Sequence, residues 1–175
     1  MRRIVLTFGL ISGAMLSAMM AISMAFHDQI GFGSVGLIIG YSTMVLAFLM
    51  IFFGIKSYRD NVGGGAVKFG KAFQVGLLIM LISSACYVAS WQVIYYKFMP
   101  DFMDKYSAYE LDKARKSGAT EVQVAAQTKQ MADFKEMYKN PLVSVAFTFF
   151  EPLPVGLVIT LVSAGVLKRK EPSPA

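Results

Sequence analysis

The 175-residue sequence has few of the residue types on which catalytic, redox and metal sites usually depend. It contains one cysteine and one histidine, and charged residues make up 16% of the chain. A single cysteine excludes a disulfide within the chain and a Cys-x-x-C motif. One histidine cannot build a histidine cluster around a metal ion. We therefore expect no cofactor and no metal site. The low charge also argues against an ordinary soluble domain, where about 25% of residues are charged.

The segment 61–65, Asn-Val-Gly-Gly-Gly, invites comparison with a phosphate-binding loop. A P-loop requires Gly, four residues and then Gly-Lys-Ser/Thr after a strand, and that order is missing. We interpret the segment as a flexible turn. The net charge of +6 is explained below by membrane topology, so we expect no nucleic-acid partner.

Apolar residues are abundant in this sequence, and they are concentrated in long runs. Three runs of 23, 27 and 25 residues contain no charged side chain, and a fourth run of 27 residues contains only Glu151. About 20 apolar residues cross a bilayer as a helix. The sequence therefore predicts an all-α fold, a bundle of four transmembrane helices in a single membrane domain. The predicted spans are residues 4–26, 34–55, 72–96 and 142–167, with an extramembrane insert over residues 97–140.

The first run also has features of a secretory signal peptide, because two arginines precede it and small residues lie near its end. The apolar core of a signal peptide has about 7–15 residues. The core from Ile4 to Phe26 is longer, so we expect it to remain as the first span.

Basic residues are distributed unequally around the four spans. Lys and Arg collect on the cytoplasmic side of short loops, and the loop from His27 to Gly33 contains neither. We therefore predict that both termini are cytoplasmic and that the insert lies outside. The basic residues of the predicted cytoplasmic side are Arg2, Arg3, Lys56, Arg59, Lys68, Lys71, Lys168, Arg169 and Lys170.

The insert is predicted to form two helices. The first covers residues 101–116, and Gly118 suits the left-handed position that ends a helix. Thr120 and Gln123 have the spacing of a capping box that opens the second helix. The insert carries 8 basic and 7 acidic residues, a balance typical of a solvated surface. We expect a helical hairpin packed at the outer membrane surface.

Small residues recur at steps of four in the first two spans. In lipid, such residues let two helix backbones approach closely. Two interpretations remain open, namely packing between the spans of one chain and contact between two copies of it. The candidate helix-packing residues are Gly9, Gly13, Ser17 and Ala21 in the first span and Gly36 and Gly40 in the second.

The fourth span is interrupted by the sequence Glu151-Pro152-Leu153-Pro154. Counted from Leu142, Glu151 lies about 14 Å into a helix, near the middle of a bilayer. A residue before proline avoids the helical conformation. The sequence therefore predicts a break in which Pro152 begins the inner half-helix and Glu151 caps it. Broken helices persist in membranes only where protein or water satisfies the backbone, so the break should face the bundle interior.

Two roles for Glu151 remain open. In the structural role, the carboxyl is protonated or bonded to hydroxyls of the third span and holds the helices together. In the functional role, it binds a cation or a proton within a pathway, as intramembrane acids often do. The candidate polar site comprises Glu151, Pro152, Pro154, Ser83, Ser84 and Tyr87.

Five segments spread over nearly the whole chain carry a resemblance to a family. They are Gly40-Tyr41-Ser42-Thr43-Met44, the run from Phe52 to Asp60, Phe69-Gly70-Lys71-Ala72-Phe73, Tyr138-Lys139-Asn140-Pro141-Leu142 and the run from Glu151 to Leu157. In combination they resemble the bacterial domain-of-unknown-function family 4199. The resemblance implies a bacterial inner-membrane protein with four helical spans. It implies no activity, so no residue role is carried over.

These observations predict a membrane protein that is not an enzyme and that acts as an assembly, accessory or regulatory component. Its expected partners are the lipid bilayer and a second copy or another membrane protein. The alternative is cation- or proton-coupled transport centred on Glu151, which would need an oligomer because four spans make a narrow bundle. An intramembrane enzyme would depend on Cys86 or Glu151 with no histidine nearby. The pair His27-Asp28 is read as a solvated loop.

Overall fold

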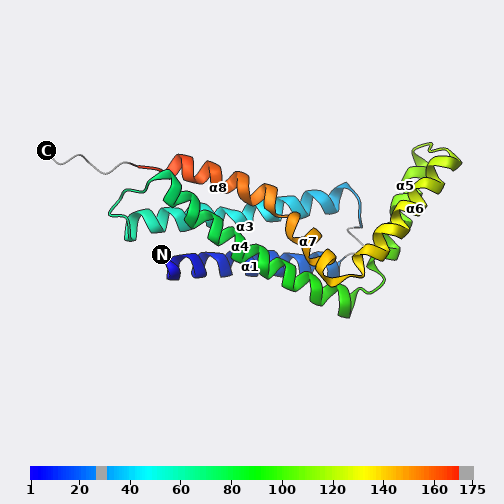
Figure 1. Cartoon of the computed structure of the whole chain (residues 1–175), viewed down its shortest axis with the longest axis horizontal. Helices are drawn as coiled ribbons and strands as arrows, with labels where there is room; N and C mark the ends of the chain where they lie inside the picture. Colours follow the sequence, from blue (N-terminus) through cyan, green and yellow to red (C-terminus); the bar gives the residue numbers. More distant parts are fainter. Residues whose placement is uncertain (27–30, 170–175) are drawn as a thin grey trace.

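The computed structural model describes residues 1–26 and 31–169, so the pair His27-Asp28 lies outside the described residues. The described residues form helices joined by short connections, and their β-structure is limited to one isolated bridge. This confirms the all-α prediction (Figure 1). The elements are α1 (Arg2–Ala25), α3 (Ser34–Asn61), α4 (Phe69–Val93), the π-helical turn η1 (Ile94–Phe98), α5 (Phe102–Lys116), α6 (Glu121–Tyr138), α7 (Pro141–Phe150) and α8 (Leu153–Leu167).

Four helical segments are long and apolar enough to cross a membrane, as predicted. They are Arg2–Ala25, Ser34–Asn61, Phe69–Phe98 and Pro141–Leu167, and the last combines α7 with α8. The third extends beyond residue 96 because η1 continues α4 to Phe98. Large apolar side chains lie exposed along these segments, among them Ile38 and Val166, each more than 60% exposed. Such a surface suits lipid rather than water.

Helix α4 is the central element of the bundle, because it contacts α1, α3, α7 and α8. Figure 1 shows α1, α3, α4 and α8 as an elongated bundle, with α5 and α6 side by side at the end opposite the N-terminus. The main core lies between α3, α4 and α8, where Phe48, Ile51, Ile79 and Met80 are at most 1% exposed. The half of the bundle nearer the N-terminus is therefore tightly filled.

Glycine residues allow the helices of this half to approach closely. A Cβ atom at Gly9 would lie 2.9 Å from Ile82, and one at Gly13 would lie 2.7 Å from the Cβ atom of Cys86. These contacts place both glycines between α1 and α4. Ser17 continues this contact, since its hydroxyl accepts a hydrogen bond of 2.8 Å from the hydroxyl of Ser90.

The other predicted packing positions behave differently. Ala21 is exposed, and nothing lies within 4 Å of a Cβ atom built at Gly40. For these two residues, packing within the chain was the wrong prediction. On α1, the stripe of small residues turns slowly around the helix and has left the α4 contact at Ala21. Gly40 lies on α3, at a position that no neighbouring side chain approaches. Gly36 is half-buried and lines a cavity described below.

Three glycines outside the predicted set also lie at close helix contacts. A Cβ atom would lie 2.3 Å from Ile79 at Gly54, 2.8 Å from Thr160 at Gly76 and 2.5 Å from Met80 at Gly156. A signal for the last was available, because Gly156, Thr160 and Ala164 repeat the spacing of small residues at steps of four in α8.

The turn between α5 and α6 is formed as its residues predicted. Gly118 has a φ of +82°, which favours glycine. The capping box is complete, since the backbone N–H of Gln123 donates to Oγ1 of Thr120 and that of Thr120 donates to Oε1 of Gln123. An ion pair between Lys135 and Asp104 joins the two helices.

Candidate functional site

The fourth membrane-length segment is interrupted between α7 and α8, as predicted, but the residues at the interruption have different roles from those predicted. Glu151 has helical backbone angles, φ −62° and ψ −52°, and closes α7 after Phe150. Pro152 is the N-cap of α8, Leu153 is its first residue, and Pro154 follows. The expectation that Glu151 would cap α8 was therefore wrong. Both prolines occupy positions where a helix has no use for a backbone N–H, so neither removes a hydrogen bond of α8.

The carboxyl of Glu151 finds one of its three predicted hydroxyl partners. Oη of Tyr87 on α4 donates to Oε2 of Glu151 at 2.9 Å, which joins the interruption to the central helix. Glu151 is exposed and Tyr87 is half-buried. Pro152 is buried behind them, whereas Pro154 is exposed. The carboxyl is thus held at one oxygen and open at the other.

The other two predicted partners lie elsewhere on α4. Ser83 is fully buried, and its hydroxyl donates to the carbonyl of Ile79 at 2.8 Å and approaches that of Gly9 at 3.2 Å. It therefore links α4 to α1. Ser84 is also fully buried, and its hydroxyl has no hydrogen-bond partner among the described residues. Neither serine reaches Glu151, because both lie about one turn nearer the packed core than Tyr87.

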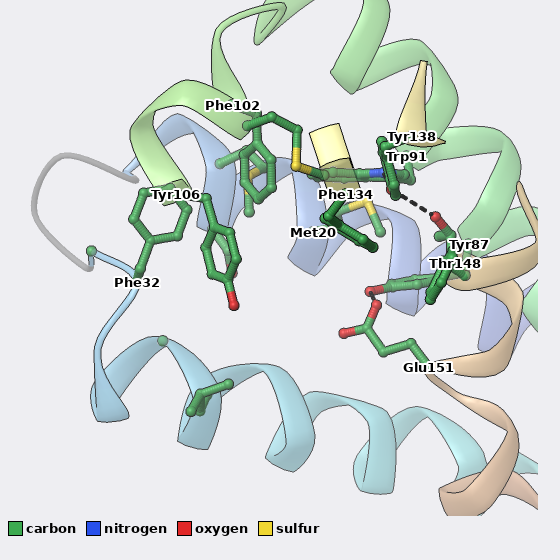
Figure 2. Close-up of a pocket in the computed structure, with 17 residues that line it drawn as sticks. Met20, Phe32, Tyr87, Trp91, Phe102, Tyr106, Phe134, Tyr138, Thr148 and Glu151 are labelled. Carbon is green, nitrogen blue, oxygen red and sulfur yellow. Dashed lines mark hydrogen bonds between the residues drawn. The ribbon is translucent and has the colours of Figure 1, made fainter. Parts of the chain in front are cut away.

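A cavity of about 500 Å³ opens beside the pair of Glu151 and Tyr87. It lies where the bundle meets α5 and α6, and side chains from α1, α3, α4, α5, α6 and α7 line it (Figure 2). The aromatic residues that line the cavity are Phe32, Tyr87, Trp91, Phe102, Tyr106, Phe134, Tyr138 and Phe147. The other lining residues are Met20, Ser23, Met24, Gly31, Gly36, Leu37, Met103, Thr148 and Glu151.

A chain of hydrogen bonds fixes one wall of this cavity. Nε1 of Trp91 donates to Oη of Tyr138 at 2.7 Å, and that oxygen lies 3.2 Å from Oγ1 of Thr148. Thr148 donates in turn to the carbonyl of Ser144 at 2.8 Å. Because an indole can only donate, and Thr148 commits its own proton to Ser144, Tyr138 must donate to Thr148. The chain joins α4, α6 and α7.

Aromatic contacts hold α5 over the opposite wall. The ring of Phe32, just before α3, lies 5.4 Å from Phe102 and 5.5 Å from Tyr106, both edge to face. The ring of Trp91 lies 4.8 Å from Phe102. Edge-to-face pairs at this distance contribute about 0.5–1.5 kcal/mol each beyond burial. Burial raises the pKa of the Tyr106 hydroxyl above its ordinary value.

The cavity carries an unusual combination of groups. Eight of its 17 lining residues are aromatic, one is a carboxylic acid, and none of the lining residues named above is Lys or Arg. In the described part of the chain, no three His, Cys, Asp or Glu residues gather closely enough to hold a metal ion. Cys86 is half-buried in the contact between α1 and α4. The chemistry available in the cavity is therefore recognition by one carboxyl and by aromatic faces.

Trp91, Tyr138 and Thr148 are not among the predicted site residues. Their involvement depends on α6 folding back against the bundle, which local sequence patterns do not specify. The aromatic residues spaced at 134 and 138 on α6 were the available signal, since a polar helix with such a stripe must bury it somewhere.

The fold and this cavity define an all-helical protein with four helices suited to crossing a membrane. A family model described as "Protein of unknown function (DUF4199)" matches residues 7–169, and the chain belongs to this family. No curated protein and no solved structure matches the chain.

Proposed function

We propose that the protein is an accessory or regulatory membrane protein, and not an enzyme, that binds an organic cation with apolar substituents in the cavity beside Glu151. One observation carries this proposal. A single carboxyl lies exposed among eight aromatic residues, held by Tyr87 at 2.9 Å, in a cavity of about 500 Å³.

The chemistry of the lining supports a cationic ligand. Aromatic faces attract cations, and desolvated contacts of this kind contribute about 2 kcal/mol. The carboxyl adds an opposite charge, and no basic side chain of the lining competes for it. An anionic ligand would meet only repulsion from Glu151, whereas a small inorganic cation would leave most of the aromatic surface without a contact.

The position of α5 and α6 supports a regulatory role. Phe102 and Tyr106 on α5 and Phe134 and Tyr138 on α6 line the same cavity as Glu151. A ligand there would touch both the membrane-length helices and the insert. Its binding would favour the arrangement in which α5 and α6 close against the bundle. A partner protein that contacts the insert would then detect the occupied state.

We also propose a location in a bacterial inner membrane with both termini cytoplasmic. The unequal distribution of Lys and Arg supports this orientation, because the loop before α3 contains neither. In this orientation, α5 and α6 form a hairpin on the extracytoplasmic side, and the cavity opens toward that side.

The single tryptophan of the chain provides the test. Trp91 lines the cavity, so its fluorescence reports occupancy directly. The full-length protein in mild detergent is titrated with tetraphenylphosphonium and with tetraphenylborate, which have the same shape and opposite charge. We expect saturable quenching by the cation only. Glu151→Gln should weaken cation binding about tenfold, because it removes the Coulombic attraction of one opposite charge beside the ligand.

A matched control separates this effect from general surface charge. Glu136→Gln removes a carboxylate that is 72% exposed and pairs with Lys139 on α6, so cation binding should not change. Equal quenching by the cation and the anion, or equal affinity of Glu151→Gln and Glu136→Gln, would contradict the proposal.

Cation- or proton-coupled transport is the second candidate, because Glu151 lies in a membrane-length segment at a helix interruption. The tightly packed core around Phe48 and Met80 gives this candidate less support, since a pathway would have to open through it. Transport predicts an ion-dependent or pH-dependent flux in liposomes that Glu151→Gln abolishes. Equal flux with both proteins would exclude it.

A further inference from the structure

A second cavity lies at the other end of the bundle, where α3 and α8 end and α4 begins. Its volume is about 600 Å³. It takes no part in the function proposed above, and its chemistry is the opposite of that of the first cavity. The lining residues are Tyr58, Gly63, Ala66, Val67, Lys68, Phe69, Lys71, Lys168 and Arg169.

A short backbone pairing brings distant parts of the chain together in this cavity. The N–H of Val67 donates to the carbonyl of Arg169 at 3.0 Å, and the N–H of Arg169 donates to the carbonyl of Val67 at 2.9 Å. This bridge fastens the segment after α8 to the loop between α3 and α4. As a result, Lys168 and Arg169 lie beside Lys68 and Lys71, about 100 positions away in sequence.

The described lining of this cavity concentrates basic side chains. Four of its nine lining residues are basic and none is acidic. Within residues 1–26 and 31–169, none of these four side chains forms an ion pair, and Lys71 donates to the neutral Gln74 at 3.0 Å. The nearby acid, Asp60, forms an ion pair with Arg59 at 2.7 Å and also interacts electrostatically with Arg169 at longer range. Among the described residues, the donors of Lys68 and Lys168 are therefore not committed to an acid and could meet a ligand with negative charge.

The first turn of α4 adds backbone donors to the same place. Lys68 is the N-cap of α4, and it forms no side-chain cap. The first N–H groups of a helix have no partner within it, and the helix dipole favours an anion there. Ala72 is the first residue of α4 whose N–H bonds backward, to the carbonyl of Lys68. Lys68, Phe69 and Lys71, which open α4, thus line the same cavity as Lys168 and Arg169.

We propose that this cavity binds the phosphate of an anionic phospholipid headgroup. The shared chemistry is that of any phosphate, but the position favours a lipid, because three membrane-length helices end here and the headgroup layer lies at that depth. Tyr58 and Phe69 line the cavity beside the bases. Phe69 is 43% exposed and Val166 is 69% exposed, so an apolar surface for acyl chains adjoins the basic one. Basic pockets between membrane helices are suited to such headgroups.

The test compares two pairs of substitutions with the same change in charge. Lys168→Gln with Arg169→Gln removes two bases from the cavity and leaves the backbone bridge intact. Arg2→Gln with Arg3→Gln removes two bases at the beginning of α1, on the same side of the predicted membrane but outside the cavity lining. Bound phosphatidylglycerol and phosphatidylcholine are counted on the full-length protein by native mass spectrometry from mild detergent.

We expect the unchanged protein to retain phosphatidylglycerol in preference to phosphatidylcholine. The cavity pair should lose at least about tenfold in affinity for phosphatidylglycerol, whereas the Arg2 and Arg3 pair should lose less than about threefold. If the cavity pair fails to fold, Lys68→Gln with Lys71→Gln removes the same charge from the other wall and should give the same loss.

Two results would overturn the proposal. Equal losses in the cavity pair and the control pair would show that the protein senses only general charge. Displacement of phosphatidylglycerol by inorganic phosphate at an equal concentration would show that the cavity takes a free anion and not a lipid.

Discussion

The two ends of the bundle differ in both packing and charge, although the same helices run between them. The cavity near Glu151 has eight aromatic residues and one acid, whereas the cavity near Arg169 has four bases and no acid. Between them, Phe48, Ile51 and Ile79 are fully buried. The difference teaches that the middle of the bundle is filled by apolar side chains, whereas the two cavities form where helix ends and connecting segments come together.

Substitution of Gly76 tests the close packing of the bundle between the two cavities, and it should have the largest effect. Gly76→Ala would place a methyl group 2.8 Å from Thr160 and 3.0 Å from both Ile51 and Ile55. Overpacking of this kind costs about 1–3 kcal/mol. We expect a loss of that size in the free energy of unfolding by sodium dodecyl sulfate.

Substitutions at two further glycines should cause smaller losses of stability. Gly156→Ala should cost less than Gly76→Ala, because its nearest neighbour is the flexible side chain of Met80. Gly40→Ala should cost nothing, because no atom lies within 4 Å. Equal stability of Gly76→Ala and Gly40→Ala would disprove close packing around α4.

The hydrogen-bonded wall of the first cavity should give a smaller effect. Tyr138→Phe removes the acceptor for Trp91 and the donor for Thr148. A buried donor left without a partner costs about 1–3 kcal/mol, and the cavity reduces this cost because water can enter beside it. We expect about 1 kcal/mol, together with a changed emission maximum of Trp91. An unchanged emission spectrum would show that α6 does not contact α4 in this way.

Tyr87→Phe should affect stability still less. It removes one hydrogen bond to a carboxyl that is already exposed, which costs about 0.5–1 kcal/mol. Tetraphenylphosphonium should still quench Trp91, because the carboxyl of Glu151 and the ring at position 87 remain. Loss of all binding in this variant would assign the recognition to the hydroxyl and not to the acid.

The ion pair between Lys135 and Asp104 should give the smallest effect. Both side chains are at least 40% exposed, and exposed pairs contribute about 0–1 kcal/mol. A double-mutant cycle with Lys135→Gln and Asp104→Asn should give a coupling energy below about 0.5 kcal/mol. A larger value would mean that this ion pair contributes substantially to holding α5 against α6.

Much of the fold was predictable because its signals are local. Long uncharged runs specify membrane-length helices wherever they occur, and Gly118 and the Thr120–Gln123 box specify a turn through their immediate neighbours. Tyr87 was predicted as a partner of Glu151 because it is one of the hydroxyl-bearing residues within the third span. The same argument nominated Ser83 and Ser84, and it could not decide how far along α4 the interruption lies.

The two cavities could not be predicted from local sequence patterns. The aromatic cavity requires α5 and α6 to fold back so that Phe102 and Tyr138 reach Trp91. The basic cavity requires the bridge between Val67 and Arg169. Each cavity depends on a contact between segments that are far apart in sequence. The distribution of Lys and Arg in the sequence predicts only that these bases lie on the same side of a membrane.

Site-directed labelling tests directly whether the two cavities face opposite sides of a membrane. In a Cys86→Ala background, Ser117→Cys marks the turn beyond α5, and Val62→Cys, a position that is 52% exposed, marks the loop beside the basic cavity. Right-side-out vesicles are treated with a membrane-impermeant maleimide before and after permeabilisation. We predict that Ser117→Cys reacts at once and that Val62→Cys reacts only after permeabilisation. Reaction of both positions in intact vesicles, or protection of both, would contradict the account.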